Sequence, residues 1–274
     1  MTVAITRWRP GVVLAFVACA LLLLAALAPG LFTGTGPDAA DPANTLLPPG
    51  SGHWLGTDEN GRDIWSRVVH GARPSLLIGL CASVLALAAG TVVGVVAAQG
   101  GRAADQVVGR VLDVLMSIPG VLLVLLVVAV LGTGTGNLVA GLALVTLPGY
   151  ARLVRAEVLR IRGAQFVEAA TVLGWSRLQV VVRHIVPNAV GPLLALATVG
   201  VGGMIVTGSA LSFLGLGPQP PTAEWGAMLA GSGDYFEVAW WTAVFPGAAI
   251  TVAVLAVSAL GQWLQDRAEG RVAR

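Results

Sequence analysis

The chain has 274 residues, of which 56% are hydrophobic and 11% are charged, and its formal net charge is +2. Soluble domains carry about 25% charged residues, so this composition predicts an integral membrane protein and argues against a nucleic-acid partner. The chain contains no lysine. A Walker A loop needs a lysine at the phosphates, so any ATP and Mg²⁺ that drive this protein must be bound by another chain.

Six apolar segments reach or approach the roughly 20 residues that a helix needs to cross the hydrocarbon core. They lie at 12–28, 76–98, 110–131, 138–153, 189–214 and 241–264. The first could instead be a secretory signal with Arg7 and Arg9 as its basic front, but its apolar run is long for one. The sequence therefore predicts an all-α protein with six transmembrane helices, the first within residues 1–29.

Arginines are distributed unequally over the predicted loops. With the N-terminus inside, thirteen of the sixteen arginines face the cytoplasm, and Arg62, Arg67 and Arg73 lie outside among five acidic residues. Cytoplasmic loops of membrane proteins carry an excess of positive charge. This bias predicts that the N- and C-termini are cytoplasmic, with an extracytoplasmic segment at 30–73 and a cytoplasmic tail at 267–274.

The end of the outer segment carries helix-start and membrane-interface signals. Asp58 or Asn60 is predicted to cap a helix over 61–71, and Trp54 suits the membrane boundary. This helix either braces the entry to the second span or contacts a protein that delivers substrate. The residues expected at the outer face are Trp54, Asp58, Arg62, Asp63 and, in the last outer loop, Trp225.

The second span carries a small residue at every fourth position of one stretch. These residues are Ala82, Ala86, Gly90, Gly94 and Ala98. Residues four apart share a helix face, and small side chains let a neighbouring helix approach closely. We expect a helix-packing face that serves either the subunit itself or a partner subunit.

Two other functions compete with these expectations. An ion-coupled carrier places charges inside the membrane, but here the interiors of the second to sixth spans are almost free of charge. Asp113 lies close to the cytoplasmic end of the third span, with Arg110 three residues earlier as its plausible partner. The sequence 231–234 fits the G-x-G-D pattern of membrane aspartyl proteases, but it lies in an outer loop and lacks a facing second aspartate. No Cys or His cluster has metal-ligand spacing, so no metal site is predicted.

The segment between the fourth and fifth spans is basic and helix-prone. Two short helices are predicted, at 164–173 and 175–185, with Gly174 permitting the turn between them. The first is expected to place four residues on one side: Phe166, Ala169, Ala170 and Leu173. The pattern fits either a docking element for another protein or an amphipathic helix that anchors the loop to membrane lipid.

Four ordered blocks resemble the permease subunits of ABC importers, and more narrowly the C-type permeases of the dipeptide, oligopeptide and nickel branch. They are the loop motif Glu168-Ala169-Ala170 with Gly174 and 183–188, and the stretches 53–73, 212–229 and 245–266. The resemblance covers most of the chain, from position 50 to position 270. Val186 departs from the family pattern, which has Leu before the proline.

The resemblance implies a type I ABC importer permease fold, with a five-helix core at 74–266 and a cytoplasmic EAA coupling loop at 156–187. It also implies a non-catalytic chain that binds no cofactor and forms half of a pore for short peptides in the bacterial cytoplasmic membrane. Nickel chelates or another peptide-like ligand are the alternative substrates.

The implied partners are a second permease, ATPase subunits or a fused ATPase, and an extracytoplasmic binding protein. The residues expected to couple to the ATPase are Glu168, Ala169, Ala170, Gly174, Trp175, Arg183 and Pro187.

Overall fold

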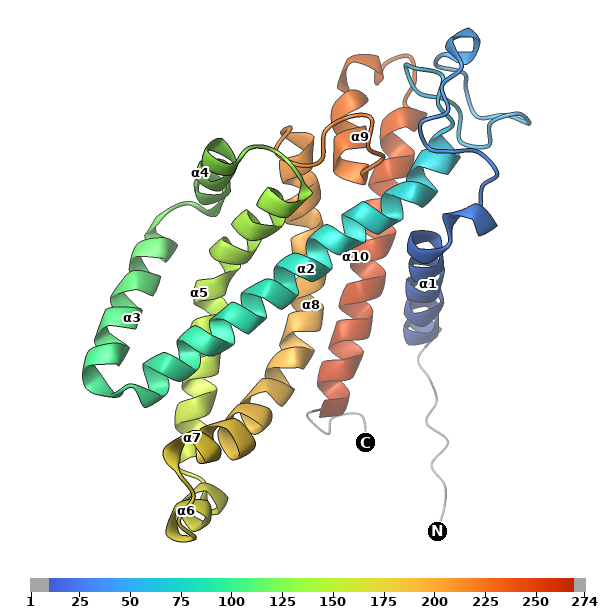
Figure 1. Ribbon diagram of the computed structural model, residues 1–274. Helices are drawn as coiled ribbons and strands as arrows, with labels where there is room; N and C mark the ends of the chain where they lie inside the picture. The colour runs from blue at the N-terminus through green and yellow to red at the C-terminus, as the bar shows by residue number, and fades with distance from the viewer. Residues whose placement is uncertain (1–9, 269–274) are drawn as a thin grey trace, which may run out of the picture.

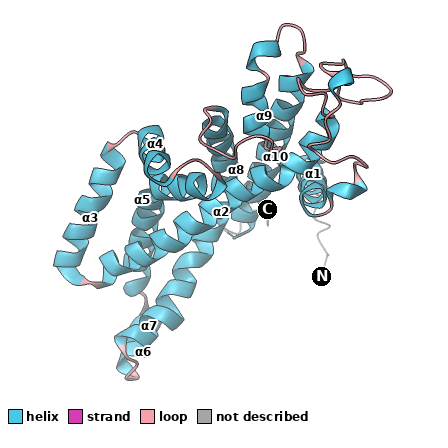
Figure 2. Cartoon of the chain, turned by 45° about the horizontal axis from the view of Figure 1, so that its top comes forward, coloured by secondary structure: helices cyan, strands magenta, loops and turns pink. Residues whose placement is uncertain are grey.

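The computed structural model describes residues 10–268, apart from the side chains of 190–192, 195, 196 and 268. Arg7, Arg9 and most of the predicted tail at 267–274 therefore lie outside the described residues. The described chain is helical, without a strand, as Figure 2 shows. Its α-helices are α1 (Pro10–Leu27), α2 (Ile64–Gln99), α3 (Gly101–Ser117), α4 (Gly120–Leu131), α5 (Thr135–Arg162), α6 (Gln165–Val172), α7 (Arg177–Val180), α8 (Val186–Phe213), α9 (Trp225–Gly231) and α10 (Trp241–Ala268).

Short non-α turns complete the backbone. Single 3₁₀ turns lie at Pro29–Leu31, Pro42–Asn44 and Gly233–Tyr235, and a π-helical turn, Val181–Ile185, joins α7 to α8. π turns are rare and concentrate at functional sites. This one lies in the segment predicted to be a plain helix over 175–185.

Four of the described helices, α1, α2, α5 and α10, are long and apolar enough to cross a membrane. The predicted third span is broken, because α3 and α4 meet at an angle of 93°. The break has a local cause: a proline disfavours helical backbone in the residue before it, and Ile118, which precedes Pro119, is extended. The predicted fifth span corresponds to α8, which is 28 residues long and contains the apolar stretch Ala197–Phe213.

Helix α2 begins twelve residues before the predicted second span, so the expected outer helix at 61–71 is its first part. Pro74 lies inside this helix, and the predicted boundary between 73 and 74 therefore falls within one element. The predicted cap was wrong. Asp63 caps α2 by accepting a hydrogen bond from Ser66 N at 2.8 Å, while the Asp58 carboxylate bonds Asn60 N and Arg62 N in the preceding turn.

The small-residue face of α2 lies against α5, behind it in Figure 1. All five of its residues are buried. A Cβ added at Gly90 would lie 2.7 Å from the Cβ of Tyr150, and one at Gly94 would lie 2.6 Å from the carbonyl oxygen of Ala151. The two helices can approach this closely only because these side chains are missing. The face is thus occupied within the chain.

The two ends of the bundle differ in character. Helices α6 and α7 project from one end, where α1 begins and α10 ends (Figure 1). The opposite end carries the long segment between α1 and α2 together with α9. The predicted coupling loop at 156–187 and the residues predicted for the outer face therefore lie at opposite ends of the molecule.

Candidate functional site

The 156–187 segment is attached to the bundle through one apolar cluster. Val158 and Ile161 of α5 pack in this cluster with Val167 and Ala170 of α6, and Ile185 of the π turn joins them. All five are buried. The segment is therefore a folded extension of α5 and α8.

The expected arrangement of α6 needs one correction. Phe166, Ala169 and Leu173 are exposed as a group, but Ala170 is buried with Val167. Ala170 lies one turn after Val167, so it borders the face of α6 that is turned towards α5. Glu168 is exposed, which leaves its carboxylate available to a partner.

Hydrogen bonds fix the turn between α6 and α7 both at the end of α6 and at the start of α7. Gly174 has φ = +83°, and Gly174 N and Trp175 N donate to the carbonyls of Thr171 and Ala170 at 3.1 and 3.2 Å. This double closure with a glycine in the left-handed region is the Schellman motif. Ser176 then caps α7 in a reciprocal box with Gln179. Both devices fix the direction in which α7 leaves α6.

Trp175 is held between two side chains of the π turn. The ring of His184 meets it edge-on with centroids 4.9 Å apart, and the Arg183 guanidinium carbon lies 5.5 Å from the ring centre. A guanidinium over an aromatic face is attracted by the ring quadrupole. Pro187 follows within the first turn of α8, where its missing N–H is tolerated. Trp175, Arg183 and Pro187 thus belong to one structural unit.

The tip of the segment exposes large apolar side chains. Val172, Leu173 and Leu178 are 87%, 77% and 72% exposed, and Val182 in the π turn is also exposed. These four residues, together with Phe166, are called the tip surface below. Contiguous exposed apolar residues mark an interaction surface. Sequence reasoning had named Phe166 and Leu173 but missed the other three, although apolar residues that flank a Gly turn were a signal for them.

Two ion pairs connect α3 with α5. Asp113 pairs with Arg152 at 2.6 Å, and the expected pairing with Arg110 was wrong because α5 brings a cation directly to this carboxylate. Asp105 receives two hydrogen bonds from Arg155, at 2.5 and 2.7 Å. The partners are 39 and 50 residues apart in the chain, which is why spacing alone did not reveal them.

At the other end, the predicted outer-face charges are engaged within the chain. Asp58 and Arg67 are buried and 3.6 Å apart, and Arg62 lies 4.0 Å from the same carboxylate. Asp63 caps α2 and its second oxygen lies 2.8 Å from His53 Nδ1. These contacts favour the interpretation of this stretch as a brace for α2.

The two predicted outer tryptophans differ in exposure. Trp54 is 69% exposed and leans on Trp65 with ring centroids 6.0 Å apart. Trp225 is buried at the start of α9 and donates from Nε1 to the Val68 carbonyl at 2.9 Å. Only Trp54 presents its ring to the surroundings of this chain.

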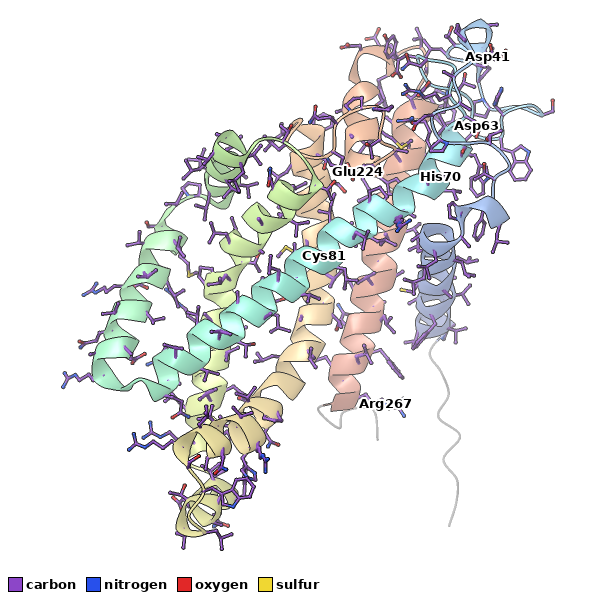
Figure 3. All side chains as sticks on the ribbon, viewed as in Figure 1. Asp41, Asp63, His70, Cys81, Glu224 and Arg267 are labelled. Carbon is purple, nitrogen blue, oxygen red and sulfur yellow. The ribbon has the colours of Figure 1, made fainter. Side chains whose placement is uncertain are left out.

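Sequence reasoning missed the buried carboxylate beside Trp225. Figure 3 shows Glu224 where the chain enters α9, close to α2. Its carboxylate accepts hydrogen bonds from Ser75 Oγ at 2.8 Å and from Gly226 N and Ala227 N at 3.0 and 2.9 Å. Glu224 therefore caps α9 and attaches it to α2.

The family of the chain follows from its match to a family model. The model, described as the binding-protein-dependent transport system inner membrane component, matches residues 90–274. The chain belongs to this family. It is a multi-pass permease of the inner membrane and performs no bond chemistry, and the ATPase of such a system is a partner. The predicted family, non-catalytic role and localisation are confirmed.

Known permeases resemble the chain over most of its length. The dipeptide transport system permease protein DppC of Alkalihalophilus pseudofirmus is 40% identical over 245 residues, which span 89% of this chain and 80% of that protein. The glutathione transport system permease protein GsiD of Pectobacterium atrosepticum is 40% identical over 218 residues, spanning 80% and 72%.

A solved structure shares the fold of this permease. The MetNI methionine ABC transporter, in an inward-facing conformation, matches 77% of this chain and 98% of its own chain with a TM-score of 0.59 and 21% identity. The predicted all-helical ABC importer permease fold is confirmed at this level. Four helices, or five if the bent pair counts as one, qualify as membrane spans within the described residues.

Proposed function

We propose that this chain is one permease of an ATP-driven importer of short peptides and forms half of its translocation pore. The observation that carries the proposal is the 40% identity, over most of both chains, with a protein named a dipeptide permease. A second candidate substrate is a glutathione-like tripeptide, favoured by the likeness to GsiD. A second, homologous permease completes the pore, and an extracytoplasmic binding protein delivers the peptide.

The proposed topology has six spans: α1, α2, the bent pair of α3 and α4, α5, α8 and α10. Both termini, the 156–187 segment and the tail at 267–274 are cytoplasmic, and residues 30–73 lead from the first span into α2 outside the membrane. The positive charge of the 156–187 segment supports this topology, because its arginines lie at the end of the bundle that holds α6 and α7. Positive charge favours the cytoplasmic side.

The tip surface of the 156–187 segment is the proposed contact with the ATPase. Its exposed apolar residues suit a cleft on another protein, and the closed turn at Gly174 lets the segment move as a unit. Glu168 and Ala169, which are exposed, lie at the rim of this contact. Nucleotide-driven closure of the ATPases then shifts the permease between inward-facing and outward-facing arrangements.

The contact is tested by placing a charge in the tip surface. We expect Leu173→Asp to reduce the ATPase that co-purifies with the tagged permease complex at least about tenfold, because a buried unpaired carboxylate costs several kcal/mol. Leu214→Asp is the matched control, since Leu214 is also exposed but caps the far end of α8, away from the 156–187 segment. Normal recovery with Leu173→Asp would leave the lipid-anchor interpretation in its place.

The substrate class is tested with the complete complex in proteoliposomes. Radiolabelled dialanine should accumulate inside only with ATP and the binding protein, and excess unlabelled short peptide should compete with it. Competition by glutathione alone would favour the second candidate. Competition by a nickel chelate and not by peptides would overturn the peptide proposal.

A further inference from the structure

The two halves of the bent pair are attached to α5 by different chemistry. Val124 and Val128 of α4 pack in one apolar cluster with Leu138 and Leu142 of α5. Of the α3 residues, all of which the structure describes, Leu112 alone is buried. α3 stands at the edge of the molecule both in Figure 1 and in Figure 2. Apolar packing therefore fixes α4 to α5 but does little to hold α3.

Ion pairs take the place of apolar packing between α3 and α5. Asp105 and Asp113 are eight residues apart and so lie near one face of α3, while Arg152 and Arg155 are three apart on α5. The Asp105–Arg155 pair is bidentate, the geometry in which charge-assisted hydrogen bonds are strongest. At the margin of a membrane an unpaired charge is costly, so both pairs stabilise the contact between α3 and α5.

The same stretch of α5 is joined to the 156–187 segment. Arg155 lies one turn before Val158, which shares an apolar cluster with Val167 and Ala170 of α6. α5 is a continuous helix from Thr135 to Arg162 and ends three residues before α6 begins. A displacement of α6 therefore moves this end of α5 and the two arginines with it.

We propose that the pairs Asp105–Arg155 and Asp113–Arg152 carry the movement of the 156–187 segment into α3, which turns relative to α4 at the break before Pro119. Asp105 and Arg155 are then positioning residues for transport. This inference rests on the proposed coupling of the segment to an ATPase. Helix α5 contains Pro148 between the residues that pack against α4 and the two arginines, and a proline inside a helix is a site of bending. With a bend there, α4 stays with the part of α5 before Pro148, α3 follows the part after it, and the angle between α3 and α4 changes between the nucleotide states.

Spin-label distances in the complete complex test this movement without a known substrate. With Cys19 and Cys81 replaced by serine, labels are placed on the exposed positions 107 in α3, 130 in α4 and 159 in α5. Between the nucleotide-free and the ATP–vanadate states, we expect the 107–130 distance to change by about 5 Å, the scale of a one-turn displacement of one element past another in switching proteins. The 107–159 distance should stay constant.

Variants of the ion pair separate transmission from mere stability. In Asp105→Asn or Arg155→Gln the 107–130 change should be reduced, and with Asp113→Asn added it should be lost, although the complex still assembles and binds nucleotide. The double reversal, Asp105→Arg with Arg155→Asp, should restore it. Glu157→Gln is the matched control, because the Glu157–Arg160 pair lies within α5 and joins no second element. Its distances should equal those of the unaltered complex.

The possible failures are distinguishable. Suppose that the unaltered complex hydrolyses ATP and that the Leu173→Asp variant loses its ATPase. If the 107–130 distance is then the same in both nucleotide states, the inference is overturned and the proposed function is intact. A normal 107–130 change in Asp105→Asn also overturns the inference. If Leu173→Asp keeps the ATPase as well, the proposed coupling through the tip surface fails together with the inference.

Discussion

Single missing methyl groups decide how closely the central helices pack. A Cβ at Gly94 would lie 2.6 Å from the Ala151 carbonyl oxygen and 2.8 Å from the Cβ of Val154. We expect Gly94→Ala to destabilise the permease by about 1–3 kcal/mol through overpacking, although Ala is the better helix former by about 1 kcal/mol. Thermal unfolding of the purified complex measures the shift.

Gly149→Ala is the control for that substitution. Gly149 lies in α5 and has no heavy atom within 4 Å of the position its Cβ would take. The same change should therefore leave the unfolding temperature unchanged or raise it slightly. Equal losses of stability for both variants would mean that close approach of α2 and α5 is not what requires glycine at position 94.

Glu224 offers a second prediction at this scale, because its carboxylate is buried and accepts three hydrogen bonds. In Glu224→Gln an NH₂ group replaces one acceptor oxygen and leaves a buried N–H or hydroxyl unpaired, which costs about 1–3 kcal/mol. We expect α9 to loosen and the chain between α8 and α10 to be cut faster by protease. Glu237→Gln, at an exposed carboxylate, should be cut at the ordinary rate.

Among the elements, the turn between α6 and α7 depends on backbone angle and not on space. Gly174 has φ = +83° with open space around the site of a Cβ. We expect Gly174→Val to strain this turn by about 1–2 kcal/mol and to reduce ATPase recovery, whereas Gly174→Asn, which tolerates the left-handed region, should retain it. Similar losses for Asn and Val would show that the residue contacts a partner instead.

Local signals in the sequence were sufficient for some elements and not for others. The four-residue spacing on α2 and the glycine between two short helices depend on neighbours in the chain, so both could be predicted. The start of α2 could not, since Asp58, Asn60 and Asp63 are all competent caps. In the folded chain the Asp58 carboxylate binds Arg67 and an amide of the preceding turn, so it does not cap the helix. The local sequence does not show which of the three residues is the cap.

In the candidate site, too, some features follow from the local sequence and others depend on tertiary packing. Its motif residues could be proposed from the sequence because they lie within one short stretch. The inward turn of Ala170 and the pairing of Asp113 with Arg152 depend on how α5 packs against α6 and α3. Contacts between residues 39 or more positions apart leave no periodic trace in the sequence.

For the whole molecule, the bent pair decides the direction of everything that follows it. If α3 and α4 together cross the membrane, the turn at 132–134 lies outside and α5 returns to the cytoplasm. If they enter and leave on the same side, α5 runs the other way and carries the 156–187 segment outside. By length and composition, the described helices are compatible with the bent pair either crossing the membrane or entering and leaving on the same side. The arginines near α6 favour the crossing, because positive loops stay inside.

Single cysteines in a Cys19→Ser, Cys81→Ser background test this topology in right-side-out vesicles. An impermeant maleimide should label Ser51→Cys and Thr133→Cys directly, and Gln165→Cys only after the vesicles are opened. Ser51→Cys, in the outer segment, controls for vesicle orientation. The reverse pattern, with position 133 protected and position 165 labelled from outside, would make the bent pair re-entrant. It would also remove the tip surface from any cytoplasmic ATPase, so the topology and the proposed coupling stand or fall together.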